Sequence, residues 1–164
     1  MRAYVAVGTN LGDRWANLVR AGRALRAVPR TAVVAASRVF DTAPVGPPQG
    51  RYLNAVLALE TGLTPAQLLG ALQAVEAGAL RRRDVRWGAR TLDLDLLLHG
   101  EAVVVTPGLV LPHPGLAARR FVLAPLADLA PELEIPGAGA TVAALLARAP
   151  GAAGDVVPAG RFPS

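Results

Sequence analysis

The sequence contains no cysteine, and all 17 of its basic residues are arginine because lysine is absent as well. Without cysteine, disulfides and thiolate metal sites are excluded, so carboxylates or the two histidines would have to hold any metal. Without lysine, a Walker A loop, Schiff-base chemistry and a lysine nucleophile are excluded. Phosphate recognition would therefore depend on guanidinium groups, backbone N–H groups or a metal ion.

Aromatic residues and long apolar runs are also scarce. The chain has two Trp, two Tyr and three Phe among 164 residues. No apolar stretch reaches the roughly 18 residues that a membrane span needs, and the run after Met1 is too short for a signal peptide. We therefore expect a cytoplasmic location. The net charge of +5 is compatible with nucleic acid, a membrane surface or an anionic small substrate as the partner.

The pattern of apolar residues predicts one α+β domain over residues 1–164. Strands are expected at 3–9, 32–40, 52–61, 92–98 and 101–105. Helices are expected from Asp13 to about 28, from Thr64 to about 77, near 115–120, and from Thr141 to about 148. The order βαββαβ predicts a ferredoxin-like sheet with helices packed on one face. The Gly-, Ala- and Pro-rich residues from about 150 to 164 are expected to form a loosely ordered tail.

Two aspartates alternate with leucines in the predicted strand 92–98. Residues two apart in a strand point to the same face, so Asp93 and Asp95 should stand side by side, with Cα atoms roughly 6–7 Å apart. Two such carboxylates repel and raise each other's pKa unless a cation lies between them. A hard cation such as Mg²⁺ removes that conflict. The pair is therefore a candidate metal site, and the alternative is an exposed edge strand with a polar outer face.

The loop before this strand carries five arginines within ten residues: Arg81, Arg82, Arg83, Arg86 and Arg90. Guanidinium groups clamp phosphate oxygens in pairs while a metal bridges and neutralises the others. Beside two carboxylates, this loop predicts a polyphosphate site, and its crowded charge would suit a lid that closes on an anion. A solvated basic loop is the alternative.

Other polar residues can converge on the same place. Glu76 lies near the end of a predicted helix, just before the arginine loop. His113 stands between two prolines, and Arg119 follows shortly after it, so a rigidly placed imidazole and another guanidinium become available. Each could equally have an ordinary structural role. His99, beside Gly100, is expected to be a turn residue.

Three of the few aromatic residues, Tyr52, Trp87 and Phe121, fall next to the candidate loops. Flat heteroaromatic ligands are often held by stacking, with an amide reading their polar edge. Asn54 lies on the same strand face as Tyr52 and can supply that amide. Ordinary core packing is the alternative for each aromatic residue.

Five motifs follow one another between residues 8 and 121: GTNLG at 8–12, TAPVG at 42–46, YLNA at 52–55, RWGARTLDLDL at 86–96, and PHP at 112–114 with RRF at 119–121. Together they resemble a family of folate biosynthesis, 6-hydroxymethyl-7,8-dihydropterin pyrophosphokinase. The fourth motif is similar to that family's signature R-W-G-P-R-x-L-D-L-D-I/L. The sequence departs from the pattern at Thr9 (usually Ser), Leu80 (usually Gly) and Ala89 (usually Pro).

The resemblance implies a ferredoxin-like fold in α/β/α layers with a mainly antiparallel sheet. It implies transfer of the β,γ-pyrophosphate of ATP to the 6-hydroxymethyl oxygen of 6-hydroxymethyl-7,8-dihydropterin, with release of AMP. Two Mg²⁺ ions, held by Asp93 and Asp95, would bridge the phosphates. ATP and the pterin would be the partners, with no nucleic acid, membrane or obligate protein partner.

The resemblance also assigns roles to individual residues. The catalytic residues would be Arg81, Arg90, Asp93 and Asp95. The residues around ATP would be Gln73, Glu76, Arg83, Arg86, Leu96, His113 and Arg119. The residues around the pterin would be Thr42, Ala43, Pro44, Val45, Tyr52, Asn54, Trp87 and Phe121, with Tyr52 and Phe121 on its two faces.

Three other functions remain open from the residues alone. A nucleic-acid-binding domain would explain the basic loop but not Asp93 and Asp95, which would repel a phosphate backbone. A metal-dependent nuclease or phosphatase could use the same carboxylates and would hydrolyse its substrate without a pterin acceptor. An interaction module without chemistry would bind neither metal nor ATP.

Overall fold

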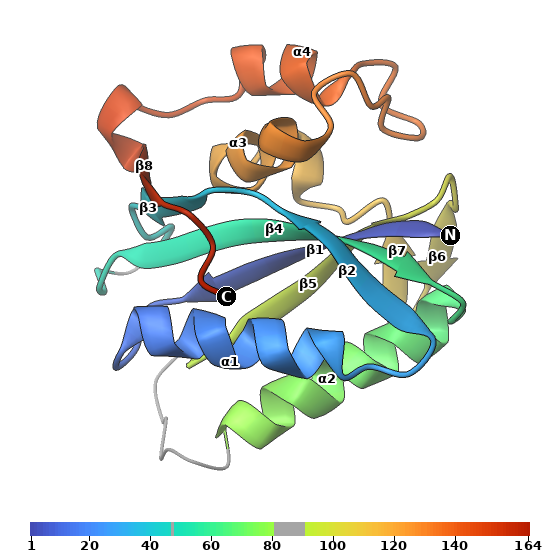
Figure 1. Cartoon of the computed structure of the whole chain (residues 1–164). Coiled ribbons are helices and arrows are strands. Elements are labelled where there is room, and N and C mark those ends of the chain that lie inside the picture. Colours follow the sequence, from blue (N-terminus) through green and yellow to red (C-terminus); the bar gives the residue numbers. More distant parts are fainter. Residues whose placement is uncertain (47, 81–90) are drawn as a thin grey trace.

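The computed structural model describes residues 1–46, 48–80 and 91–164 (Figure 1). The strands are β1 (Arg2–Thr9), β2 (Thr31–Ala36), β3 (Val39–Thr42), β4 (Tyr52–Thr61), β5 (Asp93–His99), β6 (Val104–Thr106), β7 (Leu109–Leu111) and β8 (Val156–Gly160). The helices are α1 (Arg14–Arg26), α2 (Pro65–Leu80), α3 (Arg120–Leu129) and α4 (Val142–Arg148), with 3₁₀ turns η1 (Leu116–Ala118) and η2 (Ala153–Asp155). Within these ranges, no helix is both long enough and apolar enough to cross a membrane.

The main sheet is antiparallel and has the order β5-β1-β4-β3-β8, with β2 also paired to β4. If β2 and β3 are taken as one interrupted strand, the order is fourth, first, third, second, which is the ferredoxin-like arrangement. The predicted fold class is therefore confirmed. The strand predicted at 32–40 is interrupted at Ser37, whose hydroxyl accepts a 2.9 Å hydrogen bond from the backbone N–H of Val56.

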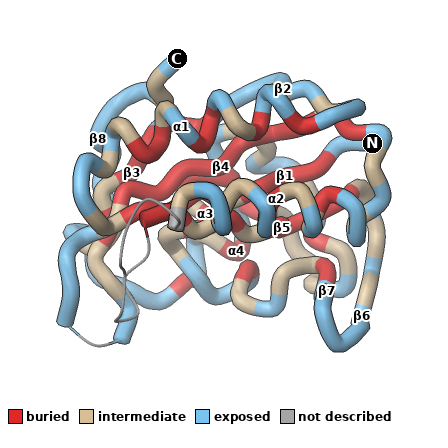
Figure 2. Tube along the Cα trace, turned by 90° about the horizontal axis from the view of Figure 1, so that it is seen from below, coloured by how far each residue is buried: buried red, intermediate tan, exposed pale blue. Residues whose placement is uncertain are grey.

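Two apolar cores lie on opposite faces of the sheet, with α1 and α2 on one side and α3 and α4 on the other (Figure 1). Figure 2 shows that most of β1, β4 and β5 is buried. Strand alternation divides the side chains between these cores. Val5 and Leu57 pack with α1 and α2, whereas Tyr4 and Val56 pack with α3 and α4. The expectation of helices on one face alone is therefore wrong, and the α/β/α layers implied by the family resemblance are confirmed.

Three helices begin at the predicted capping residues. The Asp13 carboxylate accepts a hydrogen bond from the N–H of Ala16 at the start of α1. Thr64 and Gln67 cap the start of α2 reciprocally, each side chain accepting from the other's backbone N–H. Thr141 caps α4 in the same way as Asp13 caps α1. These contacts satisfy N–H groups that have no partner inside the helix.

The chain after β5 departs from the predictions at several elements. The strand expected at 101–105 is the shorter β6, and β7 was not expected. The helix expected near 115–120 is only the short turn η1, and the longer helix α3 follows it. The loosely ordered tail expected from about residue 150 is wrong, because Val156–Gly160 forms β8 and pairs with β3 at the sheet edge. Most of β8 is exposed, so backbone hydrogen bonds rather than apolar burial hold it. An apolar pattern could not reveal such a strand.

Candidate active site

The last residues of β1 and the first residues of β4 and β5 lie side by side at one end of the sheet. They leave a hollow on the α3 side of the sheet. Gly8 of β1 pairs with Asn54 of β4 on one side and with Asp93 of β5 on the other. A Cβ atom at Gly8 would lie only 2.7 Å from Asn54 Oδ1. Because Gly8 has no side chain, the floor between its two neighbours stays open.

The hollow is a cavity of about 270 Å³ formed by four strands and the start of α3. Its lining combines carboxylates, a guanidinium, an amide, and apolar or aromatic side chains. The residues that line it are Ala6, Gly8, Thr42, Ala43, Val45, Tyr52, Asn54, Asp93, Asp95, Arg119, Phe121 and Val122. This combination suits a ligand with a flat body and an attached anionic group.

Asp93 and Asp95 lie on one face of β5, as strand alternation predicts. Asp93 is opposite Gly8 in the sheet register, and Asp95 is opposite Ala6. Among the residues placed by the structure, no group of three or more His, Cys, Asp or Glu side chains converges to hold a metal. Two carboxylates nevertheless fit Mg²⁺, which commonly binds one or two carboxylates and completes its shell with water and phosphate oxygens.

His113 approaches this carboxylate pair from the segment before η1. Its Nε2 lies 3.9 Å from Asp95 Oδ1. Its Nδ1 accepts a 3.1 Å hydrogen bond from the N–H of Gly115, so in the neutral ring the proton belongs on Nε2, which faces Asp95. The Arg119 side chain crosses the same glycine, since a Cβ atom at Gly115 would lie 2.5 Å from Arg119 Nε. Gly115 thus leaves room for the Arg119 side chain, which lines the cavity, close to the His113 ring, which faces Asp95.

The three expected ATP residues on α2 and β5 are placed differently from one another. The Glu76 carboxylate accepts a 2.9 Å hydrogen bond from the N–H of Leu94, the residue between the two aspartates. Gln73 is exposed and lines a separate hollow with β6 and β7, outside the main cavity. Leu96 is buried in the core on the α1 and α2 side of the sheet. Of the two residues on α2, Glu76 is the one whose described hydrogen bond reaches the part of β5 that carries the aspartates.

Six of the eight expected pterin residues line the cavity: Thr42, Ala43, Val45, Tyr52, Asn54 and Phe121. The Asn54 amide donates a 2.7 Å hydrogen bond to Thr42 Oγ1, and both residues are buried. Tyr52 and Phe121 both line the cavity and are half-buried. Val45 also lines it but is 73% exposed, so this loop residue covers the cavity only partly. Pro44 lines an adjoining hollow rather than this one.

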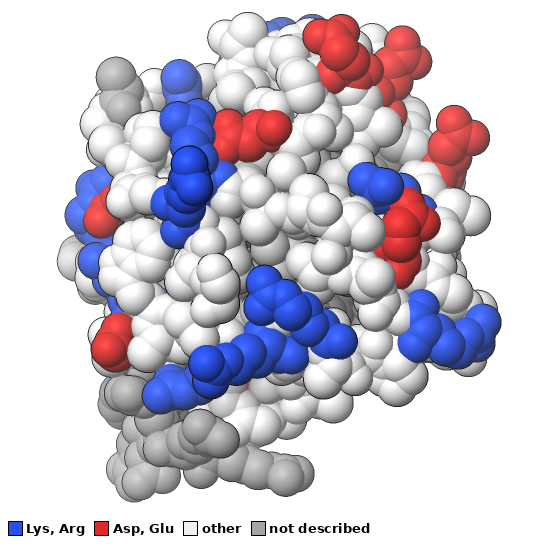
Figure 3. All heavy atoms as spheres, in the orientation of Figure 1, with Lys and Arg blue, Asp and Glu red and all other residues white. Residues whose placement is uncertain are grey.

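Five expected site residues lie outside the residues that the structure describes: Arg81, Arg83, Arg86, Trp87 and Arg90. The arginine loop therefore contributes nothing to the geometry reported above. Other arginines gather along α1, on the face shown in Figure 3. Because α1 packs on the opposite face of the sheet from the cavity, the arginines in its last turn, Arg23 and Arg26, are not among the cavity's lining residues.

A buried polar cluster beneath the site has no counterpart among the predictions. The Asn17 amide of α1 donates hydrogen bonds to Thr9 Oγ1, to the carbonyl of Leu11 and to the carbonyl of Thr91, at 3.0, 2.8 and 3.3 Å. Thr9 Oγ1 also donates to the Thr91 carbonyl, at 2.6 Å. The cluster joins the end of β1 to the residues that enter β5. A polar residue on the buried face of a predicted helix was the signal that could have revealed it.

The fold and the cavity define a ferredoxin-like α/β protein with paired carboxylates beside a partly aromatic pocket. Residues 4–131 match the family model described as 7,8-dihydro-6-hydroxymethylpterin-pyrophosphokinase. The chain is 48% identical over 150 residues to the 2-amino-4-hydroxy-6-hydroxymethyldihydropteridine pyrophosphokinase of Pseudomonas aeruginosa, with 91% of this chain and 92% of that protein covered. The Bacillus subtilis protein of the same name is 41% identical over 133 residues, 80% of each chain. The chain therefore belongs to this pyrophosphokinase family.

Solved structures show the same fold at much lower sequence identity. A crystal structure of a variant of Plasmodium falciparum HPPK-DHPS superposes with a TM-score of 0.73 and 12% identity, over 90% of this chain. The chain spans 45% of that longer chain. At this identity the likeness concerns the fold alone.

Proposed function

We propose that this chain transfers pyrophosphate from ATP to the hydroxymethyl group of 6-hydroxymethyl-7,8-dihydropterin, releasing AMP, as a step of folate biosynthesis. The observation that supports this best is one cavity that contains both the Asp93 and Asp95 carboxylates and the half-buried rings of Tyr52 and Phe121. Membership in the pyrophosphokinase family supports it independently. A flat acceptor and a metal-bound polyphosphate each find suitable chemistry in this cavity.

The pterin would lie between Tyr52 and Phe121, above the open floor at Gly8. The Asn54 amide nitrogen is engaged with Thr42, so its Oδ1 is the atom available to accept from the ring's polar edge. Because both residues are buried, this amide is oriented before the ligand arrives. Backbone groups of residues 42–45 would read the remaining edge, and Trp87 would close over the ring.

ATP would bind beside the pterin, on the side of the carboxylates. Asp93 and Asp95 would hold two Mg²⁺ ions, which would neutralise negative charge on the phosphates. Arg119, which lines the cavity, would pair with phosphate oxygens, and the His113 ring would donate from Nε2. The remaining members of the proposed ATP and catalytic set are Gln73, Glu76, Leu96, Arg81, Arg83, Arg86 and Arg90.

The proposed step forms one bond and breaks one. The hydroxymethyl oxygen of the pterin attacks the β-phosphorus of ATP, and the bond from that phosphorus to the oxygen of the α-phosphate breaks. AMP leaves with the bridging oxygen, and the hydroxyl proton passes to water. Such a reaction depends on positioning and charge neutralisation more than on a protein nucleophile.

The first test is nucleotide product analysis with Mg-ATP, with and without 6-hydroxymethyl-7,8-dihydropterin. The proposal expects AMP only when the pterin is present, and a loss of about a thousandfold or more in Asp95→Asn. Glu101→Gln is a matched control, because Glu101 is an exposed carboxylate in the turn after β5. ADP as the product, or AMP formed without pterin, would refute the proposal in favour of simple phosphoryl transfer or hydrolysis.

A further inference from the structure

The segment of residues 150–160 lies against the loop that leads into the candidate active site. β8 pairs with β3 along Val39–Thr42, and η2, just before β8, contacts the same strand. The family match ends at residue 131, so this segment is outside the part of the chain that defines the family. Its contacts with the loop are nonetheless specific.

Two backbone carbonyls of this segment accept hydrogen bonds from the loop. The N–H of Ala43 donates to the Asp155 carbonyl at 2.8 Å. The Arg51 guanidinium donates through Nη2 to the Gly154 carbonyl at 3.2 Å. Ala43 begins the loop and Arg51 ends it, so neighbouring carbonyls hold both of its ends.

Arg51, at the end of the loop, also contacts Asp41, which lies just before the loop begins. Its Nε forms an ion-paired hydrogen bond with the Asp41 carboxylate, and its Nη2 donates to the Asp41 carbonyl at 3.3 Å. Arg14 contacts both Arg51 and Asp41. Its Nη1 donates to the Arg51 carbonyl at 3.1 Å and lies 3.7 Å from Asp41 Oδ2. A planar guanidinium can make such divergent contacts at once, whereas a lysine ammonium cannot reproduce the set.

The turn that presents the two carbonyls is stabilised internally. Asp155 Oδ2 accepts from the N–H of Ala152 at 2.8 Å, and the N–H of Asp155 donates to the Ala152 carbonyl at 3.0 Å. Gly151, which precedes the turn, has φ +133°, a conformation that side chains oppose. The carbonyls of Gly154 and Asp155 therefore belong to a defined turn.

We infer that Arg51 and the 151–155 turn are positioning residues for the pterin, acting through the loop at 43–46; this inference rests on the proposed function. Thr42, Ala43 and Val45 line the cavity, and the contacts of Arg51 and the turn fix the backbone on both sides of them. A loop that is ordered in advance loses less conformational entropy when its ligand binds. We call these contacts of Arg51 and the 151–155 turn with the loop the clamp. Loss of the clamp therefore weakens pterin binding. ATP binding, which depends on β5 and His113, does not change.

The test compares Arg51→Met, Asp155→Ala, the double variant and wild type. Each is titrated with 6-hydroxymethyl-7,8-dihydropterin in the presence of Mg²⁺ and α,β-methylene-ATP, a nucleotide that cannot transfer its pyrophosphate. Arg51→Met is expected to raise the pterin Kd about tenfold, with unchanged nucleotide Kd and faster hydrogen exchange at the Ala43 amide. Arg161→Met, the loss of an exposed arginine directly after this segment, is the control and is expected to match wild type.

The double variant separates a shared clamp from two unrelated effects. Because Arg51 and Asp155 act on one loop, the double variant is expected to lose less than the product of the single losses. An unchanged pterin Kd in Arg51→Met, equal weakening of both ligands, or fully multiplicative losses would each overturn the clamp. If wild type binds no pterin and forms no AMP, the proposed function fails as well, so the two failures are distinguishable.

Discussion

The Glu76 carboxylate accepts a hydrogen bond of 2.9 Å from the N–H of Leu94, the residue between Asp93 and Asp95. Leu94 itself is buried in the core with α1 and α2, so its amide lies at the junction of helix and sheet. α2 therefore holds β5 by the backbone at the point where the two carboxylates leave the strand. Outer contacts of this kind orient metal ligands without touching the metal.

Glu76→Ala is expected to raise the Mg²⁺ concentration needed for half-maximal AMP formation by about tenfold, because the strand between the two proposed Mg²⁺ ligands loses its anchor. Glu76→Gln retains a carbonyl acceptor and should stay within about threefold of wild type. Mg²⁺ titration of the pterin-dependent reaction measures both. Equal Mg²⁺ requirements in wild type and Glu76→Ala would contradict a positioning role.

Gly8→Ala tests whether the open floor of the cavity matters. Its Cβ atom would meet Asn54 Oδ1 at 2.7 Å, and Asn54 cannot retreat freely because it is bonded to Thr42. We expect pterin binding to weaken by about tenfold or more, with a loss of about 1–3 kcal/mol in the free energy of unfolding. Calorimetric titration and denaturant unfolding would measure these. Gly108→Ala, where a Cβ would meet nothing within 4 Å, is the control.

Much of the fold could be predicted because its signals are local. The capping side chains of Asp13 and Thr64 place the starts of α1 and α2 by chemistry within one helical turn. The alternation around Asp93 and Asp95 predicts a shared face for the same reason, since strand geometry alone decides it. The sequence motifs then supplied the family, which the comparisons confirm.

The missed features depend on contacts between distant segments. Asn17 satisfies a carbonyl at Thr91, a partner that no helical pattern can identify. β8 is held to β3 mainly by backbone bonds, so its composition resembled that of a loose tail. His99 was expected in a turn, yet it is buried at the end of β5 with its Nε2 2.9 Å from the Leu63 carbonyl. The conformation at each of these positions depends on contacts that exist only when the whole sheet has formed.

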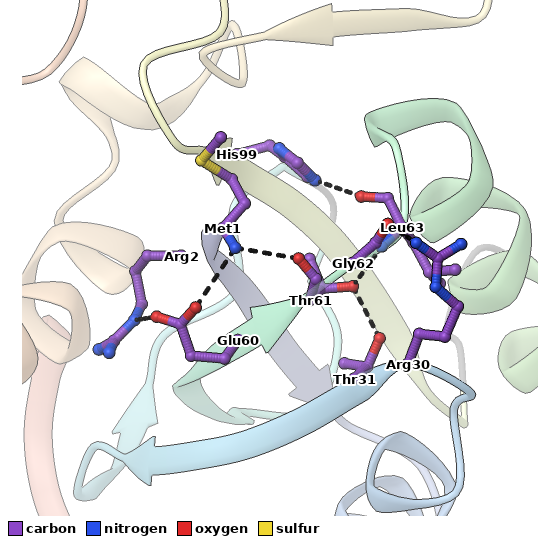
Figure 4. A network of polar contacts seen from close by, with 9 residues as sticks. All are labelled: Met1, Arg2, Arg30, Thr31, Glu60, Thr61, Gly62, Leu63 and His99. Atoms are coloured by element: carbon purple, nitrogen blue, oxygen red, sulfur yellow. Dashed lines mark hydrogen bonds and ion pairs between the residues drawn. The ribbon is translucent and has the colours of Figure 1, made fainter.

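Glu60 contacts Arg2 and the Met1 amino group at the start of the chain (Figure 4). We expect Glu60 to contribute to the pH dependence of stability. The hydrogen bond from Arg2, followed by that from the Met1 amino group, lowers the Glu60 pKa below its ordinary value of 4.5. Since the folded-state pKa is lowered, the stabilisation is present above that value and is lost as the pH falls through the folded-state pKa. The contribution is small and screened by salt, because the pair is exposed.

Thermal unfolding of wild type and Glu60→Gln between about pH 7 and pH 3 would test this. Wild type should be slightly more stable near neutrality, and the difference should shrink as the pH falls through the lowered pKa of Glu60, because the protonated side chain resembles glutamine. High salt should reduce the neutral-pH difference. A difference that grows as the pH falls would contradict the direction of the pKa shift.

Asn17→Ala should lower the free energy of unfolding. It should also change the backbone at Thr91, just before β5. The substitution removes a buried amide that donates to Thr9, Leu11 and Thr91, so carbonyls lose donors inside the fold. We expect a loss of about 2–3 kcal/mol in the free energy of unfolding and a Tm lower by roughly 5–10 °C.

Because Thr91 lies two residues before Asp93, the same variant should also need more Mg²⁺ for half-maximal AMP formation, by roughly threefold to tenfold. Arg20→Met is the control for a contact at the surface of the cluster. In the described contacts, Arg20 donates only to Asn17 Oδ1 and not to the buried groups that the Asn17 amide nitrogen holds. That control should change the unfolding free energy by less than about 1 kcal/mol. A normal Mg²⁺ requirement in Asn17→Ala would mean that the cluster stabilises the fold without positioning the carboxylates.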